Sequence, residues 1–594
     1  MAEPVVLCLS RSGETTAHRV ATALGASVHG REGRVEAANA FFPNALDHTR
    51  DLFAAGVPVI GVCAAGILIR AVAPLLNDKA GEPPVVAVAD DGSSVVPLLG
   101  GHRGANRLAR EIAAALDGRA AVTTAGDLAL GLALDEPPDG WVLENPEDAK
   151  ATMAALLAGG GAAVTGDEAA KATWLDALPR GEAVAIHATM EGSVHTDDCP
   201  TLLYRPRRAT LGVGCARDCS PEELAALVRR TLEDLNLAPA ALRGVFTLDL
   251  KADERAVIDL AASLALPMRV FDAATLESLT PRLENPSDVV FAEVGCHGVA
   301  EAAALAGGGE AAVLWSPKVK SANATCAVAV TPDPIAELRG RRRGRVALVG
   351  IGPGQAAWRT PEASRMIAEA DDLVGYSLYI DLLGPLAAGK PRHDFPLGGE
   401  EDRCRFALER AGEGRDVALV CSGDAGIYAM GALVFELLDR GDLPDPARRV
   451  EVVSAPGVSA LQAAAARAGA PLGHDFCAVS LSDLLTPRED ILRRVRAAAE
   501  GDFVIAFYNP VSRTRRTLLA EARDILLAHR PPETPVILAA NLGRAGETVR
   551  TVPLAALRVE DVDMLTVVIV GASQSRVTGG RVYTPRGYAR KRGG

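Results

Sequence analysis

Short apolar runs recur along the chain, and many end in a glycine-containing turn followed by apolar residues at helical spacing. Near residue 420, positions 417–421 predict a strand, 422–424 a turn and 432–437 a helix. This order places Asp424 at the carboxyl edge of an α/β sheet, where such proteins bind ligands. A carboxylate there can accept hydrogen bonds from hydroxyl or ammonium groups. The alternative is that Gly423 only shapes the turn and Asp424 caps the helix.

Similar patterns stand on both sides of this stretch. Upstream, an apolar strand enters the turn Gly350-Ile-Gly-Pro-Gly354. This turn differs from a dinucleotide-binding fingerprint, because its third glycine comes two residues after the second rather than three. In addition, Pro353 has no N–H to offer a pyrophosphate. Downstream, apolar strands end in small or polar residues at 452–460, 503–510 and 566–573. The strand ends are therefore predicted to converge on one cleft.

In this order the motifs resemble the tetrapyrrole (precorrin) methylase family over roughly residues 345–585. The resemblance implies that S-adenosylmethionine binds in a cleft between two α/β lobes, and that the protein is a homodimer through this domain. The segments that carry the resemblance are 350–354, 422–428, 455–460 and 508–510. The cofactor-binding residues that it implies are Pro353, Gly423, Asp424, Ile427, Tyr428, Gly457, Val458, Tyr508 and Asn509.

Within that family, residues 374–379 and 422–428 are most similar to the precorrin-3B C(17)-methyltransferase branch. Two positions depart from the family pattern: Gln355, where many relatives have Asp, and Ala425, where Pro is usual. Members of the branch methylate C(17) of precorrin-3B or its cobalt form, contract the ring and leave a δ-lactone. The resemblance implies the same reaction here. The alternative is a methylase of this fold that acts at another ring carbon.

The first part of the chain also alternates between predicted strands and helices. Residues 1–130 and 208–330 are predicted to form two α/β domains, and the less regular residues 131–207 a linking subdomain. In the second domain, Ser220 and Pro221 predict a capped helix start. Both domains resemble the cobalt-precorrin-5A hydrolase family, which opens a δ-lactone, so the whole chain resembles a bifunctional enzyme of cobalamin biosynthesis. The matching segments are 63–70, 90–92, 98–106, 246–254, 294–304 and 318–325.

Lactone hydrolysis requires a base and a donor for the developing oxyanion. His102, in the glycine-rich loop 100–106, is the candidate base, and Lys251 is the candidate that binds a substrate carboxylate or polarises the carbonyl. Glu254, close to Lys251 in the sequence, is the third catalytic candidate. Both segments follow β-rich runs, so we expect them at carboxyl strand edges, where they can form one site. Two alternatives stay open: a turn histidine and a surface lysine in unrelated places, or a non-catalytic tetrapyrrole-binding module in residues 1–330.

Residues 331–344 contain prolines, glycines and four arginines within positions 339–343. This composition predicts an exposed, solvated linker, across which residues 1–330 and 345–594 are expected to fold independently.

The composition limits the classes of partner. The chain has 594 residues, 48% hydrophobic and 23% charged, as in globular proteins, and this length suggests several domains. Its net charge of −13 argues against nucleic acid or an anionic membrane as the main partner. Because no segment resembles a signal peptide or a membrane span, we expect a cytoplasmic protein. The ten cysteines show no zinc-site spacing, so no metal site is expected.

Overall fold

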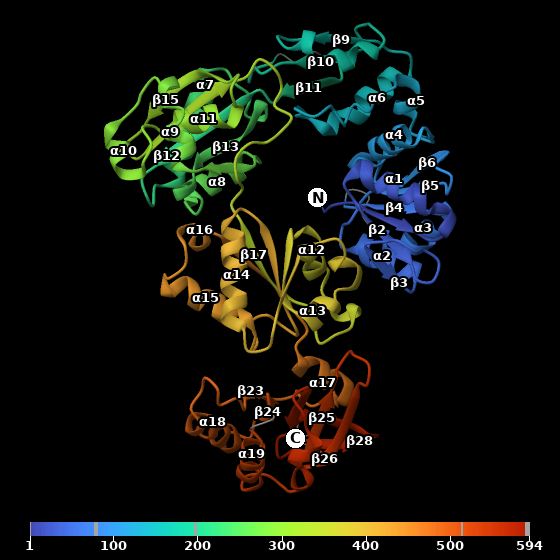
Figure 1. Cartoon of the computed structure of the whole chain (residues 1–594), viewed down its shortest axis with the longest axis vertical. Coiled ribbons are helices and arrows are strands. Elements are labelled where there is room, and N and C mark those ends of the chain that lie inside the picture. Colours follow the sequence, from blue (N-terminus) through green and yellow to red (C-terminus); the bar gives the residue numbers. More distant parts are fainter. Residues whose placement is uncertain (1, 77–80, 195–198, 513–514, 589–594) are drawn as a thin grey trace.

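The computed structural model describes residues 2–76, 81–194, 199–512 and 515–588, except for the side chains of His102, Ala125 and Asp127. In these residues the strands form six sheets, and the helices pack on the sheets in a chain of α/β units (Figure 1). The expected α/β multidomain fold is confirmed. In this part of the chain, no helix is long and apolar enough to cross a membrane.

The first unit has a seven-stranded sheet in the order β3-β2-β1-β4-β5-β6-β7. Strands β1, β4 and β5 are parallel neighbours, whereas β6 runs antiparallel to β5. The strand order reverses between β1 and β4. The strands are β1 Val5–Cys8, β2 Ser27–Arg31, β3 Ala40–Phe42, β4 Val59–Val62, β5 Val85–Val88, β6 Ser94–Leu99 and β7 Arg119–Ala120. The helices are α1 Glu14–Leu24, α2 Ala45–Ala54, α3 Ala65–Val72, α4 Ala105–Leu116 and α5 Ala125–Leu130.

The second unit is a small sheet in the order β8-β11-β10-β9. It contains β8 Trp141–Leu143, α6 Ala149–Leu157, β9 Ala162–Thr165, β10 Val184–Ala188 and β11 Thr201–Pro206.

The third unit has a five-stranded sheet in the order β14-β13-β12-β16-β15. Ser220 caps α7 by accepting a hydrogen bond from the backbone of Glu223, with Pro221 at the first helical position, as predicted. The strands are β12 Ala209–Cys215, β13 Leu242–Leu248, β14 Met268–Phe271, β15 Val313–Lys320 and β16 Ala324–Val330. The helices are α7 Pro221–Asp234, α8 Arg255–Ser263, α9 Ala273–Glu277, α10 Asp288–Val294 and α11 Ala300–Gly308.

The fourth unit is an all-parallel sheet in the order β19-β18-β20-β17-β21. Parallel strands place all their carboxyl ends at one edge. The strands are β17 Arg345–Gly350, β18 Asp372–Tyr376, β19 Arg392–Phe395, β20 Asp416–Cys421 and β21 Glu451–Ala455. The helices are α12 Pro361–Glu369, α13 Ser377–Asp381, α14 Glu400–Gly412, α15 Met430–Arg440 and α16 Asp445–Arg448.

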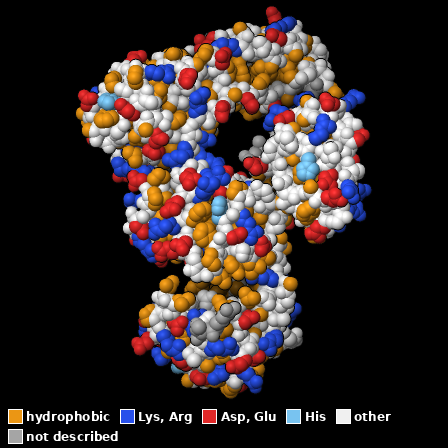
Figure 2. All heavy atoms as spheres, viewed as in Figure 1, with side chains coloured by type: hydrophobic (Ala, Val, Ile, Leu, Met, Phe, Trp, Pro, Cys, Tyr) orange, Lys and Arg blue, Asp and Glu red, His pale blue; other side chains and the backbone are white. Residues whose placement is uncertain are grey.

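The fifth unit combines a mixed sheet, β23-β24-β27-β25-β26, with a small sheet, β22-β29-β28. Figure 2 shows hydrophobic side chains along the groove between this unit and the fourth. The strands are β22 Gly469–Ala470, β23 Phe476–Ser480, β24 Val504–Tyr508, β25 Pro535–Ala540, β26 Thr548–Pro553, β27 Thr566–Val570, β28 Arg576–Thr578 and β29 Arg581–Tyr583. The helices are α17 Ala460–Ala468, α18 Arg488–Glu500 and α19 Leu518–Leu527.

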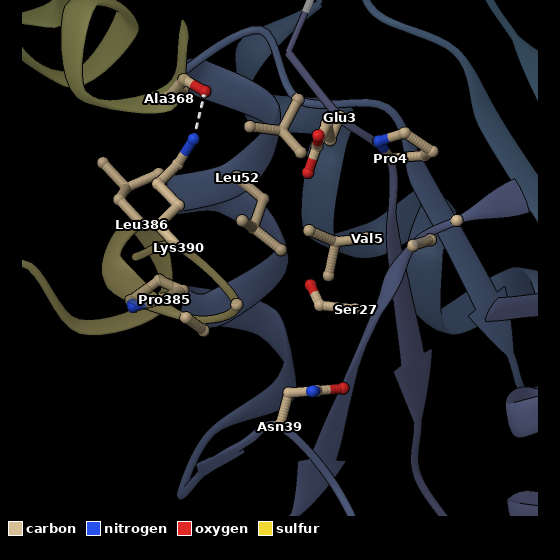
Figure 3. Close-up of a pocket in the computed structure, with 15 residues that line it drawn as sticks. Glu3, Pro4, Val5, Ser27, Asn39, Leu52, Ala368, Pro385, Leu386 and Lys390 are labelled. Atoms are coloured by element: carbon tan, nitrogen blue, oxygen red, sulfur yellow. Dashed lines mark hydrogen bonds between the residues drawn. The ribbon is translucent and has the colours of Figure 1, made fainter. Parts of the chain in front are cut away.

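The first and fourth units share one hydrophobic core, although they are far apart in the sequence. Leu52 from α2 and Leu386 from the short helix η11 (Gly384–Ala387) are both buried in it. At its edge lies a cavity of about 170 Å³, lined by Glu3 and Ser27 on one side and by Lys390 on the other (Figure 3). Lys390 Nζ donates to the carbonyl of Ala368 at 2.8 Å, and burial lowers the pKa of this lysine. The fourth unit is therefore packed firmly against the first.

Residues 331–344 are only in part the exposed, solvated linker that the sequence predicts. The residues at 332, 333, 336, 337, 339 and 340 are exposed, but the arginines at 341–343 bind the units on both sides. The backbone of Arg341 pairs with Val270 of the third unit, with N–O distances of 2.7 and 2.9 Å. Arg342 Nε donates to the carbonyl of Gly414 at 2.8 Å, and Arg343 Nε to the carbonyl of Arg449 at 2.9 Å. The arginine run therefore fastens the third unit to the fourth. Together the first four units enclose an opening, which Figure 2 shows.

Candidate functional site

The glycine turns that follow β17 and β20 pair with each other at the carboxyl edge of the fourth sheet. Gly352 and Gly423 exchange two backbone hydrogen bonds, at 3.1 and 2.9 Å. Gly423 has a φ of 72°, in the left-handed region that glycine adopts without strain. A Cβ on Gly457, which follows β21, would lie 2.0 Å from the Gly423 carbonyl oxygen. The three turns pack so closely that backbone atoms form the floor of this edge.

The carboxylate of Asp424 joins two of these turns. Its Oδ1 accepts a hydrogen bond from the backbone N–H of Gly426 at 2.8 Å, and its Oδ2 accepts one from Gly457 at 2.9 Å. Each carboxylate oxygen can accept a second hydrogen bond, so the group retains acceptor capacity for a ligand. Asp424 therefore shapes the turns themselves, and its side chain is not needed to cap α15.

Two tyrosines approach this edge from opposite lobes. Tyr428, which follows the Asp424 turn, donates its hydroxyl proton to the carbonyl of Ala478 in the fifth unit at 3.0 Å. Tyr508, at the end of β24, accepts a hydrogen bond from the backbone of Leu461 at 3.1 Å. The two rings lie 5.1 Å apart between centroids. Asn509 follows Tyr508 and donates to Ser480 Oγ at 3.2 Å.

The structure thus places the predicted cofactor residues on both walls of the interlobe groove, with Tyr508 and Asn509 in the fifth unit and the others in the turns of the fourth. Ile427 is exposed beside Tyr428, and Val458 is half-buried after Gly457. Pro353 presents its carbonyl oxygen, which Arg544 reaches from the other lobe.

Arg544 is the site residue that sequence reasoning missed. Its Nε donates to the Pro353 carbonyl at 2.7 Å, and its Nη2 donates to Ser422 Oγ at 3.1 Å. The guanidinium also lies 5.9 Å from the ring centroid of Tyr379. An arginine in the turn after β25 therefore crosses the groove and binds both glycine turns. The only sequence signal is its place in a Gly-Arg-Ala-Gly turn after an apolar strand.

His393 is held in an ion network away from these turns. Its Nε2 lies 2.9 Å from Oδ1 of the buried Asp372. Burial acts to raise the pKa of Asp372, but hydrogen bonds from Arg415 and His393 outweigh it and lower that pKa. This arrangement fits a structural role.

In the hydrolase-like half, Lys251 and Glu254 lie together at the carboxyl edge of the third sheet, because β12 and β13 are parallel. Lys251 Nζ lies 3.5 Å from Glu254 Oε2, and Arg217 Nη1 lies 3.4 Å from the same oxygen. The Glu254 side chain is only 2% exposed, and no described group is hydrogen-bonded to its Oε2. Nearby, burial raises the pKa of the Cys215 thiol to about 12 and keeps it neutral.

The loop that contains His102 follows the carboxyl end of β6, as predicted, but it lies at the edge of the sheet where the parallel strands β1, β4 and β5 begin. Strand β6 runs antiparallel to β5, so Leu99 at its end pairs with Val85 at the start of β5. Accordingly, a Cβ on Gly100 would lie 2.8 Å from Cα of Pro84, which enters β5. The His102 side chain lies outside the described residues.

The loop at 100–106 and the Lys251 segment do not form one site. They belong to different sheets, and Figure 1 places the neighbouring helices α4 and α8 on opposite sides of the central opening.

Comparisons with known proteins agree with the prediction that the chain joins a hydrolase-like half to a methylase half. Residues 345–558 match the model of the Tetrapyrrole (Corrin/Porphyrin) Methylases. Residues 47–127 match Cobalamin synthesis G N-terminal, and residues 209–329 match Cobalamin synthesis G C-terminus.

Individual relatives match the second half of the chain. A precorrin-3B C(17)-methyltransferase from Sinorhizobium sp. is 45% identical over 251 residues, which are 41% of this chain and 98% of that protein. A probable cobalt-factor III C(17)-methyltransferase from Salmonella typhimurium is 44% identical over 243 residues, which are 41% of this chain and 99% of that protein. The crystal structure of the methyltransferase CobJ is 41% identical, with a TM-score of 0.39, and the match covers 41% of this chain and 100% of that one.

Proposed function

The chain belongs to the tetrapyrrole methylase family, and from that premise we propose that it methylates C(17) of precorrin-3B or its cobalt form, with contraction of the ring. The methyl donor of this proposal is S-adenosylmethionine. The observation that carries the proposal is the closed set of turns formed by Gly352, Gly423 and Gly457 around Asp424. It stands in a domain that is 45% identical to a C(17)-methyltransferase along 98% of that enzyme.

The residues at this edge fit S-adenosylmethionine. Close-packed glycines leave backbone carbonyl groups free of side-chain cover, which suits the neutral adenine and the cationic sulfur better than an anion-binding cradle. The carboxylate of Asp424 adds a hydrogen-bond acceptor. The cofactor, when bound, supplies an electrophilic methyl group.

Methyl transfer to carbon is an in-line displacement, so the protein must chiefly position the reactants and exclude water. We assign positioning to the turns that Asp424 and Arg544 hold together across the groove. The hydrophobic side chains along the groove fit a macrocycle (Figure 2). We further propose that the protein is a homodimer through residues 345–594, which light scattering of the purified chain tests.

The proposed methylation is tested by determining which carbon of the product carries the transferred methyl group. The full-length chain is incubated anaerobically with S-adenosylmethionine carrying a ¹³C methyl group and with precorrin-3B or cobalt-factor III. We expect the label at C(17) of a ring-contracted δ-lactone. A label at another ring carbon contradicts the proposal. Since identities to the two kinds of relative are 45% and 44%, the sequence does not favour one substrate, and comparing the two rates decides which is native.

For residues 1–330 we propose opening of the δ-lactone of cobalt-precorrin-5A. Support comes from the two cobalamin-synthesis matches, which fall in the first and third units. We propose that Lys251 binds a substrate carboxylate and that the buried Glu254 positions its ammonium group. If so, Lys251→Ala raises KM for the lactone more than it lowers kcat. The rival reading, a non-catalytic tetrapyrrole-binding module, predicts binding of the lactone without its opening.

A further inference from the structure

The carboxyl edge of the seven-stranded sheet carries a polar cluster, Ser10, Ser12 and Asp90, that is separate from the methylase turns and from the Lys251 segment. At this edge Cys8 of β1 pairs with Val62 of β4, which in turn pairs with Val88 of β5. The loops that follow these three strands therefore meet there. The reversal of strand order between β1 and β4 lies at the same place, and α/β sheets bind ligands at such a reversal.

Asp90, which follows β5, is held at this edge by the loop after β1. Its Oδ2 accepts hydrogen bonds from Ser10 Oγ at 2.8 Å and from Ser12 Oγ at 2.6 Å. A Cβ on Gly13 would lie 2.8 Å from Val62 and 3.3 Å from Asp90 Oδ1, so only glycine lets the loop lie this close. Among the described residues, no group donates a hydrogen bond to Asp90 Oδ1. One carboxylate oxygen is thus fixed, and the other is available.

A cavity of about 250 Å³ opens beside Asp90. Apart from Asp90 its wall is mostly small and apolar, and burial raises the pKa of the Cys63 thiol to about 12, so this thiol is neutral. The cavity also reaches Ala65 at the start of α3, whose N–H group has no acceptor among the described residues. The lining residues are Cys63, Ala64, Ala65, Ala87, Val88, Ala89, Asp90, Ser94 and Val96. A carboxylate and an N–H donor therefore border one apolar space.

We propose that this cavity is the lactone-opening site and that Asp90, rather than His102, is the base. The proposal rests on the proposed hydrolase function. Water attacks the lactone carbonyl carbon and transfers a proton to Asp90 Oδ1, while the carbonyl oxygen becomes an oxyanion that the N–H of Ala65 stabilises. Collapse of this tetrahedral intermediate re-forms the carbonyl and breaks the acyl C–O bond. The ring alkoxide takes the proton from Asp90, which leaves a carboxylic acid, an alcohol and the ionised base.

The test uses the full-length chain with cobalt-precorrin-5A under anaerobic conditions, and follows the disappearance of the lactone. Asp90→Asn keeps the side-chain shape but removes the base, so kcat should fall about 10²–10⁴-fold. Asp91→Asn is the matched control. The Asp91 carboxylate accepts from the N–H and Oγ of Ser93 in its own turn, at 3.0 and 2.7 Å, so this variant should keep the wild-type rate.

Ser12→Ala tests positioning, because it removes one of the two donors that fix Asp90. We expect kcat to fall about tenfold, the equivalent of one lost hydrogen bond, with KM unchanged. A purely structural role for Ser12 would lower the melting temperature and leave kcat of the folded protein intact.

The outcomes separate this assignment from the proposed function. If the unmodified chain does not open the lactone, the hydrolase function fails and the assignment fails with it. If the unmodified chain is active and folded Asp90→Asn keeps more than about a tenth of its rate, only the assignment is wrong. If Asp90→Asn does not fold, an unchanged kcat in Ser12→Ala overturns the assignment.

Discussion

The Oδ2 atom of Asp424 accepts a hydrogen bond from the backbone N–H of Gly457 at 2.9 Å, and this contact ties the turn after β20 to the turn after β21. The other oxygen holds the N–H of Gly426 inside the first turn. One side chain thus fixes the relative position of two backbone segments at the proposed cofactor edge. Its loss should alter both the shape of the edge and its affinity for the cofactor.

Asp424→Ala should weaken S-adenosylmethionine binding by about 1–3 kcal/mol, because two backbone donors lose a charged acceptor. Isothermal titration calorimetry on the folded variant measures this change. Asp439→Ala, on the exposed side of α15, is the control and should leave the affinity unchanged. Unchanged affinity in Asp424→Ala would remove this residue from the proposed site.

Gly457→Ala should abolish methylation, because the new Cβ would lie 2.0 Å from the Gly423 carbonyl oxygen and must push the two turns apart. Gly399→Ala is a fair comparison: it lies in the same lobe, and its Cβ would meet no atom closer than 3.5 Å. Methylation rates and melting temperatures of both variants are needed. A Gly457→Ala enzyme with wild-type kcat would show that the turns can separate without cost to function.

The sequence predicted that the turns after β17, β20 and β21 converge, because each motif contains both a strand and the turn that ends it. The strand end at 566–573 does not join them, because β27 runs antiparallel to β24 and Val570 pairs with Ile505 at the start of β24. The direction of a strand is harder to predict from the sequence. Nothing in residues 94–99 shows that β6 is antiparallel to β5, since either direction gives the same alternation of side chains. For that reason the sequence does not show that the His102 loop lies at the edge where β1, β4 and β5 begin. Arg544 was missed because an arginine after a strand is common, and only the folded groove shows that it reaches Pro353.

The buried pair His29 and His48 should make stability depend on pH. Nδ1 of His29 lies 2.9 Å from Nε2 of His48, and burial lowers their pKa values to about 4 and about 3. Both folded pKa values lie below the unfolded value near 6.5, so the unfolded chain binds more protons on acidification. The stabilisation is complete above about pH 6.5 and is lost as pH falls from there towards 4, at about 1.4 kcal/mol per pH unit for each histidine.

Urea unfolding at about pH 7 and about pH 5 measures this slope, followed by a probe in the first unit. Replacing both residues with Gln should reduce the slope. His18→Gln should not, because His18 lies on the exposed surface of α1. Equal slopes in the double variant and the wild type would mean that other groups bind the protons.

The shared core between the first and fourth units leads to the last prediction. Leu52 and Leu386 are buried together, 1% and 2% exposed, although more than half the chain separates them in sequence. A cut within residues 331–344 would leave both apolar faces open to water, so fragments 1–330 and 345–594 should aggregate or bind each other on mixing.

In the intact chain, Leu386→Ala should lower the free energy of unfolding by about 2–5 kcal/mol and lower the melting transition of both units together. Leu227→Ala, in the separate core of the third unit, should destabilise that unit instead. Calorimetry and light scattering follow these changes. If both fragments stay soluble and monomeric and melt as they do in the full chain, the two halves fold independently and the shared core adds little to stability.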